Sequence, residues 1–136
     1  MKKFIIHDTI ERQYKNNGQH IEQLARYALT GQVLKADNIA YDCGTDCLNY
    51  QIKSARATIC KGLDLIAYIN AEKASLFLYI TKSLVAYEMN KAEYVLFCQT
   101  FGMVTRESEK NGGKPKIRLK SESKALLQWL TERANK

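Results

Sequence analysis

The sequence predicts an α+β fold, in which a central mixed β-sheet is flanked by helices. Three observations indicate it. The chain has 136 residues, of which 46% are apolar and 26% charged, a balance typical of a globular domain with its own core. Helical spacing of apolar residues alternates along the chain with short β-like runs. Residues 76–80 are apolar throughout, as in a central strand that is covered on both faces. We expect residues 1–136 to form a single domain.

The N-terminal part predicts two helices and a short strand. Residues 8–15 are expected to form a short helix capped by Asp8, which ends at Asn16, Asn17 and Gly18. Residues 19–30 predict a firm helix that ends at Gly31, followed by a short strand at residues 32–34. The apolar residues of the firm helix recur at helical spacing: Ile21, Leu24, Ala25, Ala28 and Leu29.

The middle of the chain predicts three strands and one helix. Residues 50–60 are expected to form one long strand, with a bulge near Arg56 where the alternation slips. A helix follows at residues 63–71. Two further strands, at residues 74–80 and 84–89, surround the turn at residues 81–83.

The C-terminal part predicts a capped helix, a hairpin and a last helix. Asn90 and Glu93 form the pattern of a capping box at the start of a helix over residues 90–101. Residues 103–109 and 114–120 are expected to pair around Gly112 and Gly113, and Pro115 places the second strand at a sheet edge. Ser121 or Ser123 caps a helix to about residue 134. Residues 90–136 thus elaborate a core at residues 19–90.

The charge of the chain indicates a polyanionic partner. The net charge is +7 and the isoelectric point about 9.2, which favours nucleic acid, with DNA in first place, over a membrane surface. No apolar run approaches the roughly 20 residues of a spanning helix, and the start is too soon charged for a signal peptide. We therefore expect a cytoplasmic protein that does not associate with membranes and whose thiols are reduced.

The cysteines and histidines give little support for a metal site of their own. Four thiolates could hold zinc, but Cys60 and Cys98 stand far apart in the sequence and do not form a second pair beside Cys43 and Cys47. Free cysteine is commonly a small buried apolar residue. His7 and His20 are interpreted as ordinary surface residues.

The chemistry-bearing stretch runs from Asp42 to Arg56. Gln51 and Lys53 alternate with Ile52, so in a strand they share one face. A preceding turn could bring Asp46 or Asp42 beside them. A carboxylate, an amide oxygen and an ammonium at one point would suit a hard divalent cation and a phosphate, because Mg²⁺ takes oxygen ligands and keeps several waters.

This stretch resembles the PD-(D/E)XK nuclease superfamily, whose hallmark is an Asp, a short hairpin, then Glu or Asp, any residue and Lys. The matching pieces are Gly44-Thr45-Asp46 and Gln51-Ile52-Lys53-Ser54, with Glu22 on an earlier helix, and the resemblance covers roughly residues 19–90. It implies a restriction-endonuclease-like core and catalysis with Mg²⁺ or Mn²⁺. Asp46 and Gln51 would hold the metal, with Asp42 in reserve, and Glu22 and Lys53 would complete the catalytic set.

Two features of this resemblance leave alternatives open. Gln51 stands where the family usually has a carboxylate, and its neutral oxygen contributes less to a dication site. Some members of the family have lost catalysis and only bind. Glu22 is interpreted either as the helix carboxylate of the nuclease or as an exposed surface residue.

A basic strand gives a second candidate site. Between residues 114 and 120 basic residues alternate with Pro115, Ile117 and Leu119, so one face is cationic and the other packs. Such a ribbon can follow a phosphate backbone, and the alternative is protection of an exposed sheet edge. Arg56 is either a further phosphate contact or an ordinary surface arginine. The expected DNA-binding residues are Arg56, Arg106, Lys110, Lys114, Lys116, Arg118 and Lys120.

Three functions follow from these features. The first is a metal-dependent endonuclease that hydrolyses DNA phosphodiester bonds, in which a double-strand cut requires a homodimer or two successive nicks. The second is a nuclease-fold protein with a weakened or inactive site that binds DNA without cutting it. The third is a subunit that uses its basic face for an acidic protein partner.

Overall fold

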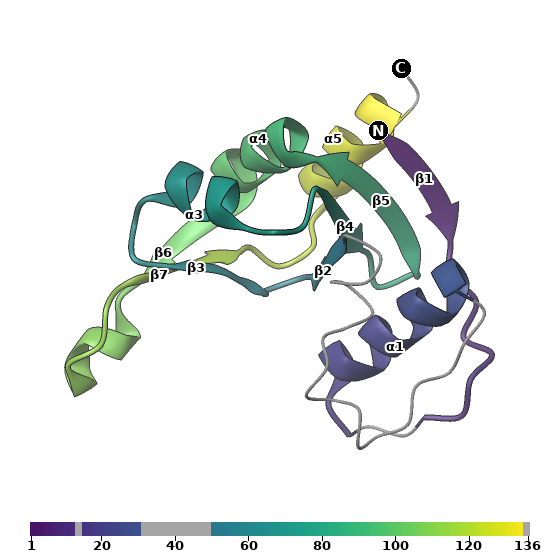
Figure 1. Ribbon diagram of the computed structural model, residues 1–136, viewed down its shortest axis with the longest axis horizontal. Coiled ribbons are helices and arrows are strands. Elements are labelled where there is room, and N and C mark those ends of the chain that lie inside the picture. Colours follow the sequence, from purple (N-terminus) through teal and green to yellow (C-terminus); the bar gives the residue numbers. More distant parts are fainter. Residues whose placement is uncertain (13–14, 31–49, 135–136) are drawn as a thin grey trace.

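The computed structural model describes residues 1–12, 15–30 and 50–134, and within these ranges it has an α+β fold. Figure 1 shows a β-sheet between two helical layers, with α1 on one side and α3, α4 and α5 on the other. The four-stranded sheet has the order β1-β5-β4-β2, and a three-stranded sheet has the order β3-β7-β6. The predicted fold class is confirmed.

The elements have the following bounds. The larger sheet contains β1 (Lys2–Ile5), β2 (Tyr50–Ser54), β4 (Leu76–Ile80) and β5 (Val85–Asn90). The smaller sheet contains β3 (Thr58–Lys61), β6 (Gly102–Thr105) and β7 (Lys116–Leu119). The helices are α1 (Asn17–Thr30), α3 (Leu65–Ala71), α4 (Lys91–Phe101) and α5 (Lys124–Ala134), with a short 3₁₀ turn, η2 (Glu107–Asn111).

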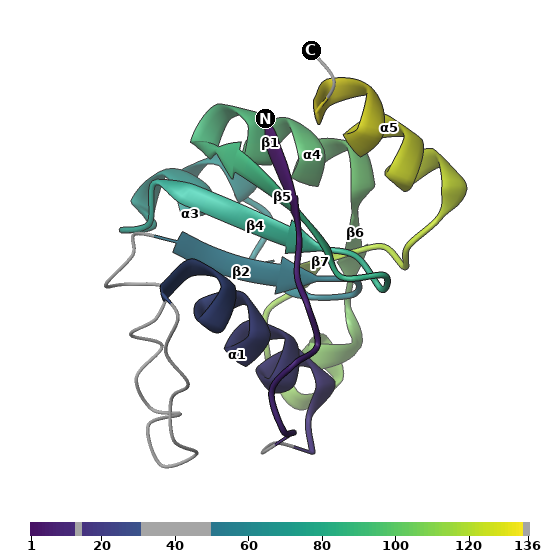
Figure 2. The same cartoon turned by 90° about the vertical axis from the view of Figure 1, so that its right-hand side faces the viewer.

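Strand β4 is the centre of the larger sheet, as its apolar sequence predicts. It pairs with β5 in the antiparallel direction and with β2 in the parallel direction. Residues Phe77, Leu78, Tyr79 and Ile80 are each no more than 1% exposed. The sheet is therefore mixed, as expected, and among the described strands β2 lies at one edge (Figure 2).

The two faces of this sheet pack into two separate cores. On one face, Phe77 and Tyr79 pack with Phe97 of α4 and Leu130 of α5. On the other face, Ile80 and Ala86 pack with Leu24 and Ala25 of α1, and Ile52 lies against them. Because neighbouring residues of a strand point to opposite faces, this division decides which layer each side chain of β2 meets.

Helix α1 begins two residues earlier than predicted. The side chain of Asn16 accepts a hydrogen bond from the backbone N–H of Gln19 at 3.2 Å, so Asn16 caps the helix rather than breaking the chain before it. The predicted short helix is wrong for residues 8–12, which are not helical. The predicted helix end at Gly31 and the strand at residues 32–34 lie outside the described residues.

His20 is not the surface residue that the sequence suggested. It is 7% exposed in α1, and its Nε2 lies 3.3 Å from a carboxylate oxygen of Asp8. Asp8, predicted as a helix cap, is thus a partner of the histidine. The sequence pattern missed this contact because it joins an irregular segment to a helix across twelve residues.

The predicted long strand at residues 50–60 is wrong, because the chain turns after Ser54. The backbone N–H of Ala57 donates to the carbonyl of Ser54 at 3.1 Å, and Arg56 has a φ of 66°. The turn moves the chain from one sheet to the other, so that β2 pairs with β4 while β3 pairs with β7. The sequence predicts a bulge here, because the alternation of side chains breaks near Arg56. In the structure the chain instead passes from the larger sheet to the smaller one at this point.

The C-terminal elements agree with the sequence in most respects. Asn90 and Glu93 form the predicted capping box, and Tyr94, Phe97, Cys98 and Phe101 form the buried face of α4. The hairpin is present, but residues 107–111 form the 3₁₀ turn η2 in place of extended strand. Ser123 begins α5, since its side chain accepts from the N–H of Leu126 at 3.2 Å.

The placement of β7 at a sheet edge is wrong. This strand is central in its sheet, between β3 and β6. Pro115 precedes the strand and therefore removes no ladder hydrogen bond, while its carbonyl accepts from the N–H of Gly62 at 2.7 Å. Pro115 thus marks the beginning of the strand and not its exposure. Over the part of the chain that the structure describes, there is no helix of the length and apolarity needed to cross a bilayer.

Candidate functional site

Gln51 and Lys53 lie on one face of β2, as predicted. In the parallel pairing, Gln51 is opposite Phe77 and Lys53 is opposite Tyr79. Paired residues share a face, so both polar side chains stand on the α4 side of the sheet. Ile52, between them, packs on the α1 side. The period-two alternation of a strand produces this arrangement.

The ammonium group of Lys53 is held at the end of its own strand. It donates to the backbone carbonyl of Thr58 at 3.3 Å, across the turn that follows β2. A hydrogen bond with Tyr94 and then the positive charge of Lys53 oppose the rise of the pKa of the buried Cys98 thiol. Burial is the larger influence and raises the pKa of Cys98 to about 12. Lys53 is thus partly exposed, with its ammonium group at the turn that follows β2.

Glu22 lies in a different layer from Gln51 and Lys53. It belongs to α1, which covers the opposite face of the sheet. One of its carboxylate oxygens is 3.6 Å from a guanidinium nitrogen of Arg26, one helical turn on. Its side chain is 29% exposed. The described structure thus brings Gln51 and Lys53 together but does not place Glu22 on their face of the sheet.

The carboxylates that are predicted to bind the metal lie in a part of the chain that the structure does not describe. Asp42 and Asp46 lie outside the described residues. Within the described ranges, no group of three or more His, Cys, Asp or Glu side chains is placed to hold a metal ion. A metal site formed by Gln51 with Asp46, or with Asp42 in reserve, stays a prediction.

The basic strand β7 alternates as predicted. Ile117 and Leu119 are buried, whereas Lys116 and Arg118 are partly exposed on the other face. Since β7 is central in its sheet, protection of an open edge does not explain these two cations. The adjacent strand β3 adds another, because Lys61 is the pairing partner of Lys116. Lys61 was missed because strand pairing is not visible in the local sequence.

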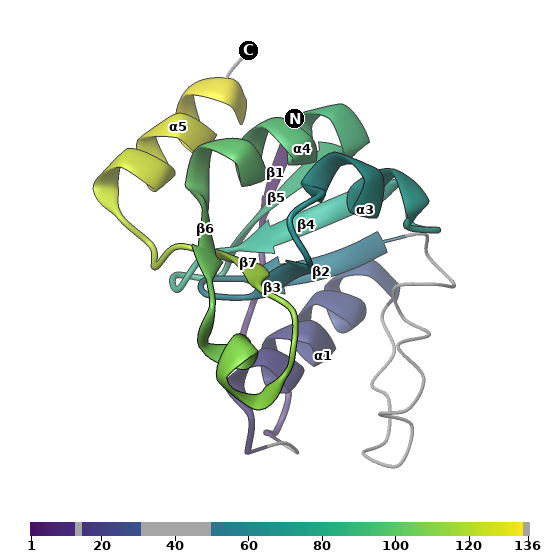
Figure 3. The same ribbon diagram turned by 90° about the vertical axis from the view of Figure 1, so that its left-hand side faces the viewer.

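The other predicted DNA-binding residues lie around this sheet. Arg106 forms an ion pair with Glu109 at 2.8 Å, which partly neutralises it. Lys110 lies on η2, and Lys114 and Lys120 flank β7, all three exposed. Figure 3 shows η2, in bright green, at the end of the β6–β7 hairpin, and Figure 1 shows that this end lies far from α1. We call Lys61, Lys116 and Arg118 the basic face.

The phenol of Tyr50 is engaged with a carboxylate on the other face of the larger sheet. Its hydroxyl donates to Glu88 at 2.6 Å. Burial and then this carboxylate raise the pKa of Tyr50 to about 12. Glu88 therefore has a partner in the layer of α1, on the face opposite Gln51 and Lys53.

We expect the folded protein to lose stability above about pH 9. Burial raises the pKa of Cys98 to about 12 and also raises the pKa values of Tyr79 and Tyr94. These groups are neutral in the folded protein. Their contribution to stability is complete below their pKa values in the unfolded chain, which are about 8.5 for cysteine and about 10 for tyrosine. It is lost as the pH rises toward their pKa values in the folded protein. Urea unfolding at about pH 8 and pH 10.5 should show a lower midpoint at the higher pH. A Cys98→Ala variant should lose less between these two pH values, and equal losses would contradict the assignment to Cys98.

The fold and the site together define an α+β protein. It has a polar pair, Gln51 and Lys53, on a strand of the larger sheet and the basic face on the smaller sheet. Comparisons with protein-family models, with curated proteins and with solved structures each gave no match.

Proposed function

We propose that the protein binds DNA and hydrolyses its phosphodiester bonds as a metal-dependent endonuclease. The observation that carries this proposal is the position of Gln51 and Lys53 on one face of β2, directly before the turn into the basic face. The basic face points away from the core that contains Phe77 and Tyr79, whereas Gln51 and Lys53 point to that core's side, so the two approach each other only at the turn after β2. There Lys53 donates to the carbonyl of Thr58, the pairing partner of Arg118. A phosphodiester at the Arg118 end of the basic face would therefore come near the ammonium group of Lys53. The resemblance of this strand to the PD-(D/E)XK motif supplies the chemistry.

The proposed roles follow from the chemistry of each side chain. Gln51 and Asp46 would be the ligands of Mg²⁺ or Mn²⁺, with Asp42 as the reserve. A bound dication would lower the pKa of a coordinated water and stabilise charge on the phosphate. Lys53 would hold a phosphate oxygen or the attacking water through its ammonium group. Glu22 is outside this ligand set, because α1 covers the other face of the sheet.

The proposal is tested by incubating supercoiled plasmid with the purified protein and Mg²⁺ or Mn²⁺, with and without a chelator. We expect conversion to the nicked form, and its loss with the chelator. Linear product without a nicked intermediate would indicate that two copies act together. Intact plasmid at metal concentrations that saturate the protein would contradict hydrolysis.

A second function is favoured by the missing charge at Gln51. An amide oxygen holds a dication less strongly than a carboxylate does. The same fold would then bind DNA through its basic face without cutting it. Salt-dependent DNA binding that does not require metal, together with an intact plasmid, would support this second function.

Removing charges from the basic face is expected to weaken DNA binding in a salt-dependent way. In a Lys61→Ala, Lys116→Ala double variant, each lost phosphate contact should reduce the slope of log K against log salt by about 0.9 on duplex DNA. Fluorescence anisotropy over a range of salt concentrations measures this slope. The charge-matched control is Lys3→Ala with Lys73→Ala, whose side chains are exposed on β1 and before β4. If the two double variants have equal slopes, the change follows from the net charge and not from phosphate contacts of the basic face.

A further inference from the structure

We propose that a cleft at the Arg118 end of the basic face binds the phosphate backbone of a nucleic-acid strand through Arg56, Lys82 and Arg118. The cleft lies between the first turn of α1, the turn from β2 to β3, the end of β4 and the middle of β7. The inference rests on the proposed function only in that the phosphate belongs to nucleic acid. It requires neither the metal nor hydrolysis.

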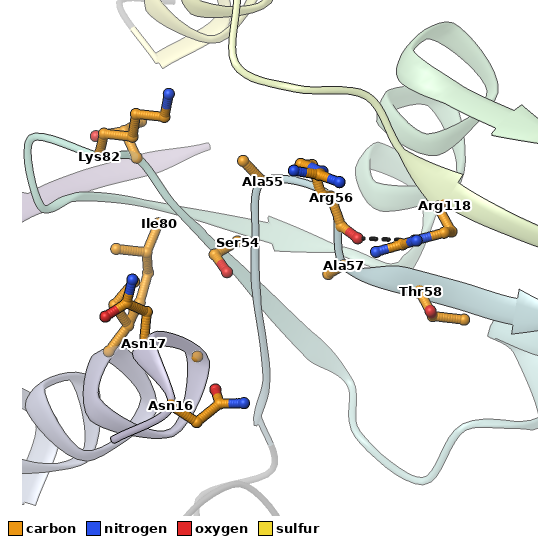
Figure 4. A pocket seen from close by; sticks show the side chains of 13 residues that line it. Asn16, Asn17, Ser54, Ala55, Arg56, Ala57, Thr58, Ile80, Lys82 and Arg118 are labelled. Carbon is orange, nitrogen blue, oxygen red and sulfur yellow. Dashed lines mark hydrogen bonds between the residues drawn. The ribbon is translucent and has the colours of Figure 1, made fainter. Parts of the chain in front are cut away.

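The cleft has a volume of about 550 Å³, within the usual range of small-molecule sites. A lone phosphate would fill only a small part of this space, whereas a phosphate with its sugars would fill more of it. Figure 4 shows that its walls come from segments far apart in the sequence, with Asn16 and Asn17 on one side of Ser54 and Arg118 on the other. The size of the cleft thus favours a strand over a free ion.

Three cations from three different segments line this cleft. Arg56 lies in the turn after β2, Lys82 in the turn after β4 and Arg118 on β7. Across the described residues, none of these three side chains forms an ion pair. The nearby carboxylate of Glu122 accepts instead from the backbone N–H of Lys82, at 2.9 Å. Cations that share a concave surface without a counter-ion repel one another, and a bound anion removes that cost.

Arg118 is oriented to present its guanidinium to an anion. Its Nε donates to the backbone carbonyl of Arg56 at 3.1 Å, a contact drawn in Figure 4. This hydrogen bond fixes one edge of the planar group, and the two terminal nitrogens carry further N–H donors. Two parallel N–H donors match the oxygens of a phosphate. A lysine could supply the charge but could not make both sets of contacts.

Arg56 occupies a strained backbone position at the same place. Its φ of 66° lies in the left-handed region, where a residue other than glycine costs on the order of 1 kcal/mol or more. Its side chain is exposed and so contributes little to the core. The strained turn has two effects at the cleft: it places the arginine charge at the wall, and it turns the carbonyl toward Arg118.

The N-terminus of α1 adds a weaker attraction for anions at the same cleft. Asn17 and Gly18 line the cleft in the first turn of this helix of 14 residues. The free N–H groups of a helix N-terminus carry a partial positive charge that favours anions. Arg56, Lys82 and Arg118 carry the inference, and the helix end strengthens the field in which they act.

The test measures the binding of a short fluorescent single-stranded oligonucleotide by anisotropy, with a chelator present so that no cleavage occurs. Arg118→Lys keeps the charge and should weaken binding about tenfold, because the fixed bidentate geometry is lost. Lys82→Ala should weaken it several-fold. Lys73→Ala, which removes an exposed lysine before the other end of β4, is the control and should change affinity little. Inorganic phosphate at high concentration should compete with the oligonucleotide for the original protein, beyond the effect of chloride at the same ionic strength.

A second variant separates binding from folding. Arg56→Gly should weaken binding while leaving the thermal midpoint equal or higher, because glycine adopts a positive φ without strain. A variant that only damaged the fold would lower both. Unchanged affinity in Arg118→Lys and Arg56→Gly would overturn the inference, as would losses no larger than those of Lys73→Ala.

These results are distinguishable from those of the plasmid experiment. If the plasmid stays intact but the cleft variants lose oligonucleotide binding, the cleft inference stands and hydrolysis fails. If the plasmid is cut by the original protein and by the cleft variants at equal rates, with equal affinities, the cleft inference fails and the proposed function stands.

Discussion

Lys53→Ala is expected to reduce plasmid cleavage at least about a hundredfold, the scale on which one preorganised charge acts in a transition state. Its ammonium group stands at the end of β2, held by the carbonyl of Thr58. DNA affinity should stay close to that of the original protein, because the basic face and the cleft keep their charges. Initial rates of nicking and anisotropy on the same preparations measure both quantities. An equal loss of affinity and rate would assign Lys53 to binding instead of chemistry.

Gln51→Glu is expected to have the opposite effect. A carboxylate next to a dication is favoured over an amide dipole by Coulomb's law, so Mg²⁺ should bind more tightly and cleavage should rise at lower metal concentration. Asp46→Asn should abolish cleavage and Asp42→Asn should not. Calorimetric titration with Mg²⁺ gives the affinity directly. If Gln51→Glu leaves that affinity unchanged, Gln51 does not face a metal, and DNA binding without cleavage becomes the better proposal.

Phe97→Ala should cause the largest loss of stability, about 3–5 kcal/mol. The side chain is fully buried at 0% exposure, and its ring lies 5.0 Å from Tyr79 and 5.6 Å from both Phe101 and Trp129, measured between ring centres. Its removal leaves a cavity where α4 and α5 meet the larger sheet. Since small domains are stable by only about 5–15 kcal/mol, this variant should be close to unfolding. Denaturant titration followed by circular dichroism measures the loss.

The matched control for this variant is Leu96→Ala, one residue earlier on α4. Leu96 is 47% exposed, so its truncation should cost well under half as much, since it leaves no enclosed cavity. Both substitutions have the same effect on helix propensity within a few tenths of a kcal/mol. A similar loss in the two variants would show that α4 does not bury Phe97 as described.

Local patterns in the sequence were sufficient for several elements. The capping box of Asn90 and Glu93 and the apolar spacing of Tyr94, Phe97 and Phe101 predicted α4 correctly, because both signals act within a few residues. The unbroken apolar run of β4 predicted a strand covered on both faces. The shared face of Gln51 and Lys53 followed from the two-residue period of a strand, which requires only that residues 50–54 be extended.

Tertiary structure alone decided the pairing of the strands and the composition of the cleft. Whether β7 is central or at an edge depends on β3, which precedes it by more than fifty residues. The positive φ of Arg56 has no local signal, because the residue is not glycine and the turn exists only where the chain changes sheets. Arg56, Lys82 and Arg118 line one cleft because β2 and β4 run parallel and end together, while β7 pairs with the strand that follows the turn. Strand pairing joins residues distant in the chain through backbone hydrogen bonds available to almost any side chain, so the identities of these residues could not reveal that they would come together.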